Sequence, residues 1–194
     1  PDPAPKPPTA PKPPPVAKPD PAPANPVGSV ENGKFPLKPG RETRYVYTPD
    51  FRDASAATVT FTVPSNIGKG VMYNSVQILS SQDGRKGYRS TVTLKASGSL
   101  HLTIATVTNG RATTLEQKMI APGGTYRPGH RVSVELGYVD GAIKAKAWRS
   151  DKKEPRWQLS EPAKAPPSAS DGVRILGYLS SGAPNSVTTK WTLQ

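Results

Sequence analysis

The sequence of 194 residues contains no cysteine, which excludes disulfide bridges, Cys-ligated zinc or iron–sulfur sites and thiol nucleophiles. It has two histidines, His101 and His130, which lie far apart with no third metal ligand implied. No run of 18 apolar residues occurs, so no segment is long enough to cross a membrane as a helix. We therefore expect no metal, no cofactor and no membrane span.

The first 26 residues contain no glycine and no aromatic residue, but they hold 13 of the 24 prolines. We assign residues 1–30 to an extended Pro/Lys-rich arm or linker and residues 31–194 to one globular body. Lys6, Lys12 and Lys18 recur at every sixth residue, which places them along one edge of a polyproline II helix. The arm is either a semi-rigid spacer or a segment laid along a partner, and we expect it to be ordered only against a partner.

Helical periodicity is absent from about residue 41 onward, where apolar and polar residues alternate instead. Val59, Phe61 and Val63 share one face of an extended chain, and the threonines between them share the other. Similar patterns and the turns between them predict ten strands: Arg44–Tyr47, Thr58–Val63, Met72–Ser80, Tyr88–Lys95, Leu100–Thr108, Thr113–Ile120, Arg131–Val139, Ala142–Arg149, Val173–Tyr178 and Thr188–Leu193. Many short strands without helices indicate an all-β sandwich or barrel, whose first and last predicted strands we expect to be neighbours.

Two dipeptides mark tight turns between these strands. Asn109-Gly110 and Asp140-Gly141 each separate two alternating segments, and both pairs readily adopt the positive φ that a two-residue hairpin requires. We therefore assign Gly110 and Gly141 a structural role.

Alternation fails between Ser150 and Asp171, where four prolines predict a long connection without strand pairing. Trp157 lies in this segment, and Trp148 lies shortly before it. Two indoles so close to a loop are expected to cap the edge of the core, and a ligand-stacking platform is the alternative.

A set of short motifs from Tyr88 to Trp157 resembles the concanavalin A-like jelly-roll modules of laminin-G-like type. These modules occur in actinobacterial surface proteins and in minor tail proteins of phages that infect actinobacteria. The motifs are Tyr88-Arg89, Val92, Leu94, Ser97-Gly98, Leu100-x-Leu102, Tyr126-Arg127-Pro128-Gly129, Asp140-Gly141, Ala145-Lys146-Ala147-Trp148 and Glu154-Pro155-x-Trp157. The resemblance covers about residues 58–194 and implies a two-sheet antiparallel jelly-roll sandwich, without specifying chemistry.

Jelly-roll folds also include glycanases, which need two carboxylates at the bond to be cleaved. The usual single-strand pattern of such enzymes, Glu-x-Asp-x-x-Glu, is absent here. Glu135 is the only acid in the centre of a predicted strand, where a solvated surface charge is expected. A Gly-x-Ser-x-Gly elbow and a phosphate-binding loop are also absent. We interpret the protein as not an enzyme.

Positive charge is the remaining functional signal, with 26 Lys and Arg against 14 Asp and Glu and a net charge of +12. Lys144 and Lys146 share a predicted strand face that points to solvent. The candidate surface for a polyanion, glycan or partner comprises Lys144, Lys146, Arg149, Lys152, Lys153, Arg156 and Tyr88. The alternative is a lysine-protected strand edge. Nucleic acid is disfavoured because no aromatic array lies between the cations.

Tyrosines are a second source of candidate binding residues. Tyr45, Tyr47, Tyr73, Tyr88, Tyr126 and Tyr178 are suited to stacking on sugar rings, although tyrosines at strand positions more often fill a core or cover an edge. Tyr88 is already part of the candidate basic surface, but the sequence singles out none of the six as a sugar-stacking residue.

The favoured hypothesis is a non-catalytic structural or adhesive module of a phage virion, a minor tail or accessory virion protein. It would be present in multiple copies, recognise a host-surface glycan or a neighbouring virion subunit, and use the arm as a tie or spacer. The alternative is a carbohydrate-binding module of a secreted actinobacterial enzyme or cell-wall protein. The expected location is accordingly the virion, or the secreted or wall-associated fraction.

Overall fold

The computed structural model describes residues 32–41, 44–48, 56–81, 83–163 and 172–193. The arm of residues 1–30, with Lys6, Lys12 and Lys18, lies outside the described residues, and its conformation and contacts stay predictions. In the described part of the chain, no helix is long and apolar enough to cross a membrane.

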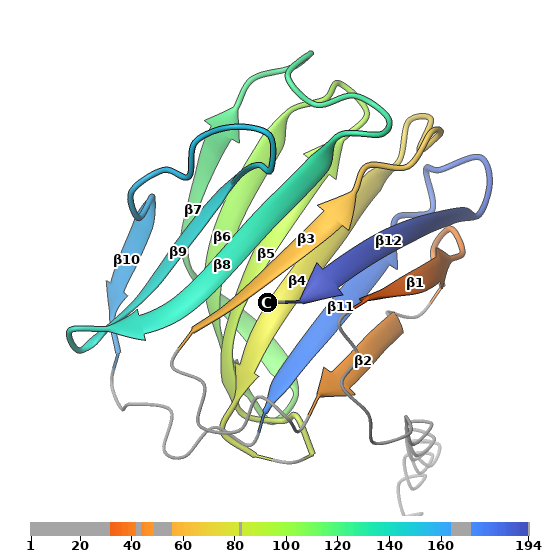
Figure 1. The fold of residues 1–194 in the computed structure, drawn as a ribbon. Coiled ribbons are helices and arrows are strands. Elements are labelled where there is room, and N and C mark those ends of the chain that lie inside the picture. Colours follow the sequence, from red (N-terminus) through yellow and green to blue (C-terminus); the bar gives the residue numbers. More distant parts are fainter. Residues whose placement is uncertain (1–31, 42–43, 49–55, 82, 164–171, 194) are drawn as a thin grey trace, which may run out of the picture.

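The described residues form two antiparallel β-sheets packed face to face (Figure 1). The front sheet, nearer the viewer in Figure 1, has the strand order β1-β12-β3-β8-β9-β10, and the back sheet has the order β2-β11-β4-β5-β6-β7. The front strands are β1 (Asn32–Leu37), β12 (Val187–Leu193), β3 (Ala56–Thr62), β8 (Arg131–Val139), β9 (Ala142–Arg149) and β10 (Leu159–Pro162). The back strands are β2 (Arg44–Thr48), β11 (Val173–Leu179), β4 (Val71–Leu79), β5 (Gly87–Lys95), β6 (Leu100–Thr108) and β7 (Arg111–Ala121). The predicted all-β sandwich is confirmed.

The core lies between the sheets and is built from the apolar residues of each alternating strand. Phe61 in β3, Leu102 in β6, Val134 in β8, Ile143 in β9 and Ile175 in β11 are at most 1% exposed. Full burial of such a side chain contributes about 1.5–3 kcal/mol to stability. Because successive side chains of a strand point to opposite faces, burial of this row fixes which residues face outward.

Both predicted hairpin turns are confirmed by the backbone. Asn109 and Gly110 have φ of 53° and 78°, and Asp140 and Gly141 have φ of 53° and 75°. Two successive residues with positive φ form the type I′ turn that matches the twist of paired strands. A Cβ atom at either glycine would meet nothing within 4 Å, so the dihedral angle rather than crowding favours glycine there.

The predicted pairing of residues 44–47 with the last strand is wrong. β12 pairs with β1 and β3 in the front sheet, whereas β2 pairs with β11 in the back sheet. β1 was not predicted as a strand, yet its Phe35 and Leu37 point inward and are each 2% exposed. Gly33 continues this inward row, and a Cβ atom there would collide with the Trp191 indole. β1 therefore needs a glycine at position 33, although glycine has a low propensity for β-strands.

The predicted connection between Ser150 and Asp171 also contains an additional strand, β10, which pairs with β9. Leu159, 2% exposed, anchors this strand on the core. β10 is the last strand of its sheet, where proline is tolerated because one side of the strand has no ladder partner. Pro162 at its end is therefore compatible with pairing, which the sequence analysis did not anticipate.

The edge strands β7 and β10, which belong to different sheets, meet along one side of the sandwich. The backbone N–H of Ser160 in β10 donates a hydrogen bond to Oε2 of Glu116 in β7 over 3.1 Å. The predicted strand Thr113–Ile120 thus supplies a carboxylate that joins the two sheets.

The turn at Gly141 generates a prediction about stability. Gly141→Ala is expected to lower the free energy of unfolding by about 1–2 kcal/mol, because a left-handed backbone brings a Cβ atom too close to the following carbonyl oxygen. Asn tolerates this region better, so the matched control Gly141→Asn should cost less. Urea unfolding measures both variants, and a fully stable Gly141→Ala protein would contradict the turn assignment.

Candidate functional site

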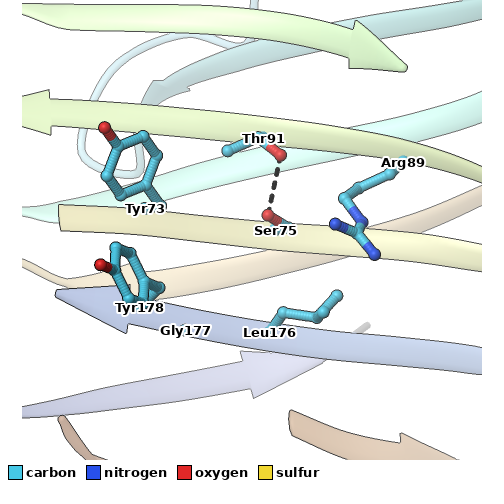
Figure 2. A pocket seen from close by; sticks show the side chains of 7 residues that line it. All are labelled: Tyr73, Ser75, Arg89, Thr91, Leu176, Gly177 and Tyr178. Atoms are coloured by element: carbon cyan, nitrogen blue, oxygen red, sulfur yellow. Dashed lines mark hydrogen bonds between the residues drawn. The ribbon is translucent and has the colours of Figure 1, made fainter. Parts of the chain in front are cut away.

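A hollow of about 290 Å³ lies on the outer face of the back sheet (Figure 2). Its lining comes from three adjacent strands and comprises Tyr73 and Ser75 of β4, Arg89 and Thr91 of β5, and Leu176, Gly177 and Tyr178 of β11. Its volume is close to the lower end of the range for small-molecule sites, about 300–1,000 Å³. The hollow is therefore large enough to hold part of an extended ligand.

The alternation of β4 places the side chains of this hollow outside the core. Met72 and Val76 point inward and are at most 2% exposed, so Tyr73 and Ser75 face outward. The cross-strand register brings Tyr178 of β11 directly opposite Tyr73. The two rings have centroids 5.7 Å apart and planes tilted by 47°. They form a half-buried aromatic platform at one end of the hollow (Figure 2).

Polar groups occupy the rest of the hollow. The hydroxyl groups of Ser75 and Thr91 are hydrogen-bonded to each other at 2.8 Å, between the tyrosines and Arg89 (Figure 2). Nε and Nη2 of Arg89 donate hydrogen bonds to Oε1 of Gln77 over 3.1 and 2.8 Å. Gln77 is fully buried, and its Nε2 donates to the carbonyl of Gly84 over 3.2 Å. The guanidinium is therefore held in place by a neutral amide.

The electrostatic environment of Arg89 is unfavourable to its charge. Burial and the positive charge of Arg174 lower the pKa of the Arg89 guanidinium from its ordinary value. Among the described residues, no carboxylate lies within 4 Å of Arg89. Its guanidinium also has more N–H groups than the two that Gln77 accepts.

The described residues that line the hollow include no aspartate and no glutamate. The two convergent carboxylates of glycoside hydrolysis are therefore not assembled among these side chains. The arrangement provides ring faces, hydroxyl groups and one cation, which are groups that bind a ligand and orient it.

The basic cluster predicted from the sequence is arranged differently from expectation. Lys146 does not point to solvent: it is 8% exposed, with Nζ 3.1 Å from Glu135 and also bonded to Glu154. Its Nζ lies 4.2 Å from the ring centroid of Trp157 and 5.8 Å from that of Trp148. Glu135, expected to be a solvated charge, is instead one of the two partners of a largely buried ammonium group.

The surroundings of Lys146 shift the pKa of its ammonium group upward. Burial by itself lowers the pKa of the ammonium group, but hydrogen bonds to Glu154 and Glu135 outweigh burial and raise the pKa above its ordinary value. Lys146 therefore stays charged and serves as the centre of an ion-pair and aromatic contact. That role leaves it unsuited to capture a polyanion from solution.

Other members of the cluster are partly neutralised. Lys144 lies 3.3 Å from Asp140, and Arg149 pairs with Asp151 through two hydrogen bonds. Lys152, Lys153 and Arg156 are exposed and have no ion-pair partner within the described ranges. The proposal of a polyanion surface thus retains these three residues at most.

The two predicted structural tryptophans and Tyr88, the aromatic residue of the predicted surface, lie in different parts of the fold. Trp148 and Trp157 lie on the outer face of the front sheet around Lys146, not at the edge of the core. Trp157 lies over Gly137, where a Cβ atom would be 3.1 Å from the ring. Tyr88 belongs to β5 in the back sheet and packs against the core, so the structure does not bring it to the lysines.

A second hollow, of about 570 Å³, lies at the other end of the front sheet. Lys34 of β1 and Lys190 of β12 are directly opposite each other in the register, and Arg131 of β8 contributes to the same lining. All three are exposed and have no ion-pair partner in the described part of the chain. The sequence analysis did not single them out, because they are far apart in the sequence.

The two histidines make separate contacts. His101 faces outward on β6 and is half-buried, and its Nε2 is buried without a hydrogen-bond partner among the described residues. Nδ1 of His130 accepts a hydrogen bond from the backbone N–H of Arg127 over 3.1 Å. In the described ranges, no group of three His, Asp or Glu side chains is placed to hold a metal ion.

Tyr73 and Tyr178 are among the six candidate tyrosines, but nothing in the sequence connects them with Arg89. The two tyrosines are opposite each other only through pairing of β4 with β11, strands about a hundred residues apart in the chain. An outward-facing tyrosine beside a serine two residues later is a local signal. The register that completes the hollow is a long-range property.

The fold is that of a jelly-roll β-sandwich, and comparison with known proteins agrees with this class. No family model matches the sequence, and no curated protein matches it at the sequence level. Solved structures do match, as expected from a fold that many unrelated sequences adopt.

Two similar structures illustrate the range of proteins with this fold. The CBM2 module of the evolved Dit of Lactobacillus casei BL23 phage J-1 is 10% identical, with a TM-score of 0.50 over 84% of this chain and 65% of that chain. Xylan β-1,4-xylosidase from Bacillus halodurans C-125 is 12% identical, with a TM-score of 0.51 over 83% of this chain and 32% of that chain. The likeness concerns the fold, and this chain spans only part of either protein.

The surroundings of Lys146 generate a second prediction. Lys146→Met is expected to lower the free energy of unfolding by about 1–3 kcal/mol, because Glu135 would remain largely buried without its partner. The matched control is Lys153→Met, an exposed lysine nearby, which should change stability by less than about 0.5 kcal/mol. Urea unfolding at neutral pH gives both values.

The pH dependence of this difference has a definite sign. Because the pKa of Lys146 is raised in the folded state, its stabilisation is complete below the unfolded-state pKa of about 10.4 and is lost as pH rises through the folded value. A difference between wild type and Lys146→Met that disappears already near pH 8 would contradict the ion-pair assignment.

Proposed function

We propose that this protein is a non-catalytic glycan-binding module and that the hollow on the back sheet is its binding site. The observation that carries the proposal is the Tyr73–Tyr178 platform beside the hydroxyl groups of Ser75 and Thr91. The described lining residues provide binding groups and no pair of carboxylates, which supports binding without cleavage.

The chemistry of the hollow is complementary to a sugar. The C–H face of a pyranose ring is apolar and packs against an aromatic ring. This contact is stabilised by burial of apolar surface and by attraction between the C–H groups and the negative face of the aromatic ring. The hydroxyl groups of a sugar exchange hydrogen bonds with serine, threonine and arginine side chains. A half-buried platform with polar groups on one side therefore suits a sugar better than a wholly apolar ligand.

We place this module on a phage virion, as a minor tail or accessory virion protein that recognises a glycan of the host surface. The resemblance of its motifs to actinobacteriophage tail modules supports this setting, and the fold also occurs as the CBM2 module of a phage Dit. Residues 1–30 would tie the body to the particle or space it from it. A neighbouring virion subunit is the other partner that this setting allows.

The alternative setting is a carbohydrate-binding module of a secreted actinobacterial enzyme or wall protein. The similarity to part of a xylosidase chain is compatible with this setting, since a domain with this fold forms part of that glycosidase chain. Both settings use the same binding hollow, so they differ in location and in partners and not in the binding chemistry.

The glycan-binding proposal predicts that loss of either tyrosine ring weakens binding. Tyr73→Ala and Tyr178→Ala should each reduce the affinity for a bound glycan by about two- to tenfold, since one aromatic contact contributes about 0.5–1.5 kcal/mol. Calorimetric titration with ligands selected on a glycan array measures the loss. Tyr73→Phe retains the ring and should retain most of the affinity.

The control outside the hollow is Lys153→Ala, which removes an exposed side chain of the front-sheet loop. It should leave the affinity unchanged. Equal losses in Lys153→Ala and Tyr73→Ala, or full affinity in both tyrosine variants, would place the glycan elsewhere on the protein.

The virion setting predicts that purified particles of the phage that encodes this chain contain it in several copies. Quantitative mass spectrometry of gradient-purified particles gives the copy number against the major tail protein. If the polypeptide is absent from particles and present in the culture medium or the cell-wall fraction, the alternative setting is correct.

A further inference from the structure

The partners of Arg89 distinguish it from three cations of the front sheet. Lys144, Lys146 and Arg149 on the front sheet each contact at least one carboxylate. Arg89 contacts the amide oxygen of Gln77 and, among the described residues, no carboxylate. Within the part of the chain that the structure describes, the positive charge of Arg89 in the hollow is therefore not neutralised by an ion pair.

The charged form of Arg89 is destabilised in this position. A charge removed from water is destabilised unless an opposite charge or strong hydrogen bonds replace the solvent. The pKa of the Arg89 guanidinium is lowered by burial and by the neighbouring charge of Arg174, which shows the direction of this penalty. An anion that enters the hollow relieves the penalty and is bound more strongly for that reason.

The guanidinium is also oriented in advance. Its Nε and Nη2 are fixed on Gln77, which is itself fully buried and bonded to the carbonyl of Gly84. The remaining N–H groups belong to a side chain that lines the hollow. A planar carboxylate matches the planar donor fork of arginine, and its single charge balances one guanidinium.

We propose that the hollow selects acidic glycans, with a sugar carboxylate bound at Arg89 and a neighbouring ring of the same glycan on Tyr73 and Tyr178. This inference rests on the proposed glycan-binding function and adds the chemical class of the ligand. Arg89 is opposite Gln77 in the register, four residues along β4 from Tyr73, or about 13 Å of strand. The separation suits two successive units of one chain better than a single sugar.

The test compares each oligosaccharide of a panel in two forms, the free uronic acid and its methyl ester. Esterification removes the charge and leaves the ring in place. For ligands that depend on Tyr73, we expect the free acid to bind wild-type protein at least tenfold more tightly than the ester in low salt. Arg89→Gln should abolish this preference while it retains ester binding, and Arg89→Lys should restore only part of it.

The matched control is Arg131→Gln, which removes an equal charge from the front sheet, where Arg131 is exposed without an ion-pair partner among the described residues. It should leave the preference for the acid unchanged. If Arg131→Gln weakens acid binding as much as Arg89→Gln does, the preference is a general effect of net charge and the inference is wrong.

The remaining outcomes separate this inference from the proposed function. Tyrosine-dependent binding with equal affinity for acid and ester overturns the selection of acidic glycans and leaves glycan binding intact. Absence of binding to every member of the panel in both forms overturns both. Binding of esters to Arg89→Gln with wild-type affinity shows that the variant is folded and that its hollow is formed.

Discussion

The structure depends on one constraint, the burial of every second side chain of antiparallel strands between two sheets. The inward-facing residues, such as Phe35 and Trp191, fix the register of neighbouring strands. A shift of one strand by one residue would turn its inward-facing side chains toward solvent. The outward row is then determined as well. Tyr73, Ser75, Arg89 and Tyr178 meet on one face because Met72, Val76 and Ile175 are buried on the other.

The sequence was informative wherever a structural signal is local. Alternation within a segment and the dipeptides Asn109-Gly110 and Asp140-Gly141 were sufficient to predict most strands and two hairpins. It was uninformative where pairing joins distant segments. β1 has only a few alternating residues and contains Gly33 and Pro36, so its role appears only when Trp191 is in place above Gly33.

In the candidate site, too, local features were predictable from the sequence and long-range contacts were not. Alternation correctly placed Lys146 on the outer face of its strand, but the expected solvent exposure was wrong. Glu135 on the next strand and Glu154 and Trp157 in a loop surround its ammonium group. The hollow of the back sheet needs three strands in register, and one of them, β11, is distant in the chain from the consecutive strands β4 and β5. Residue types were readable from the sequence, and their neighbours across strands were not.

The hydrogen bond from Ser160 to Glu116 has a consequence for how copies of this protein associate. An edge strand with a free N–H is a template for a strand of another molecule. Because the carboxylate of β7 occupies that N–H group, the outer edge of β10 is a poor site for such strand addition. Any strand addition between copies of this protein would therefore have to use another edge strand of the two sheets, β1, β2 or β7.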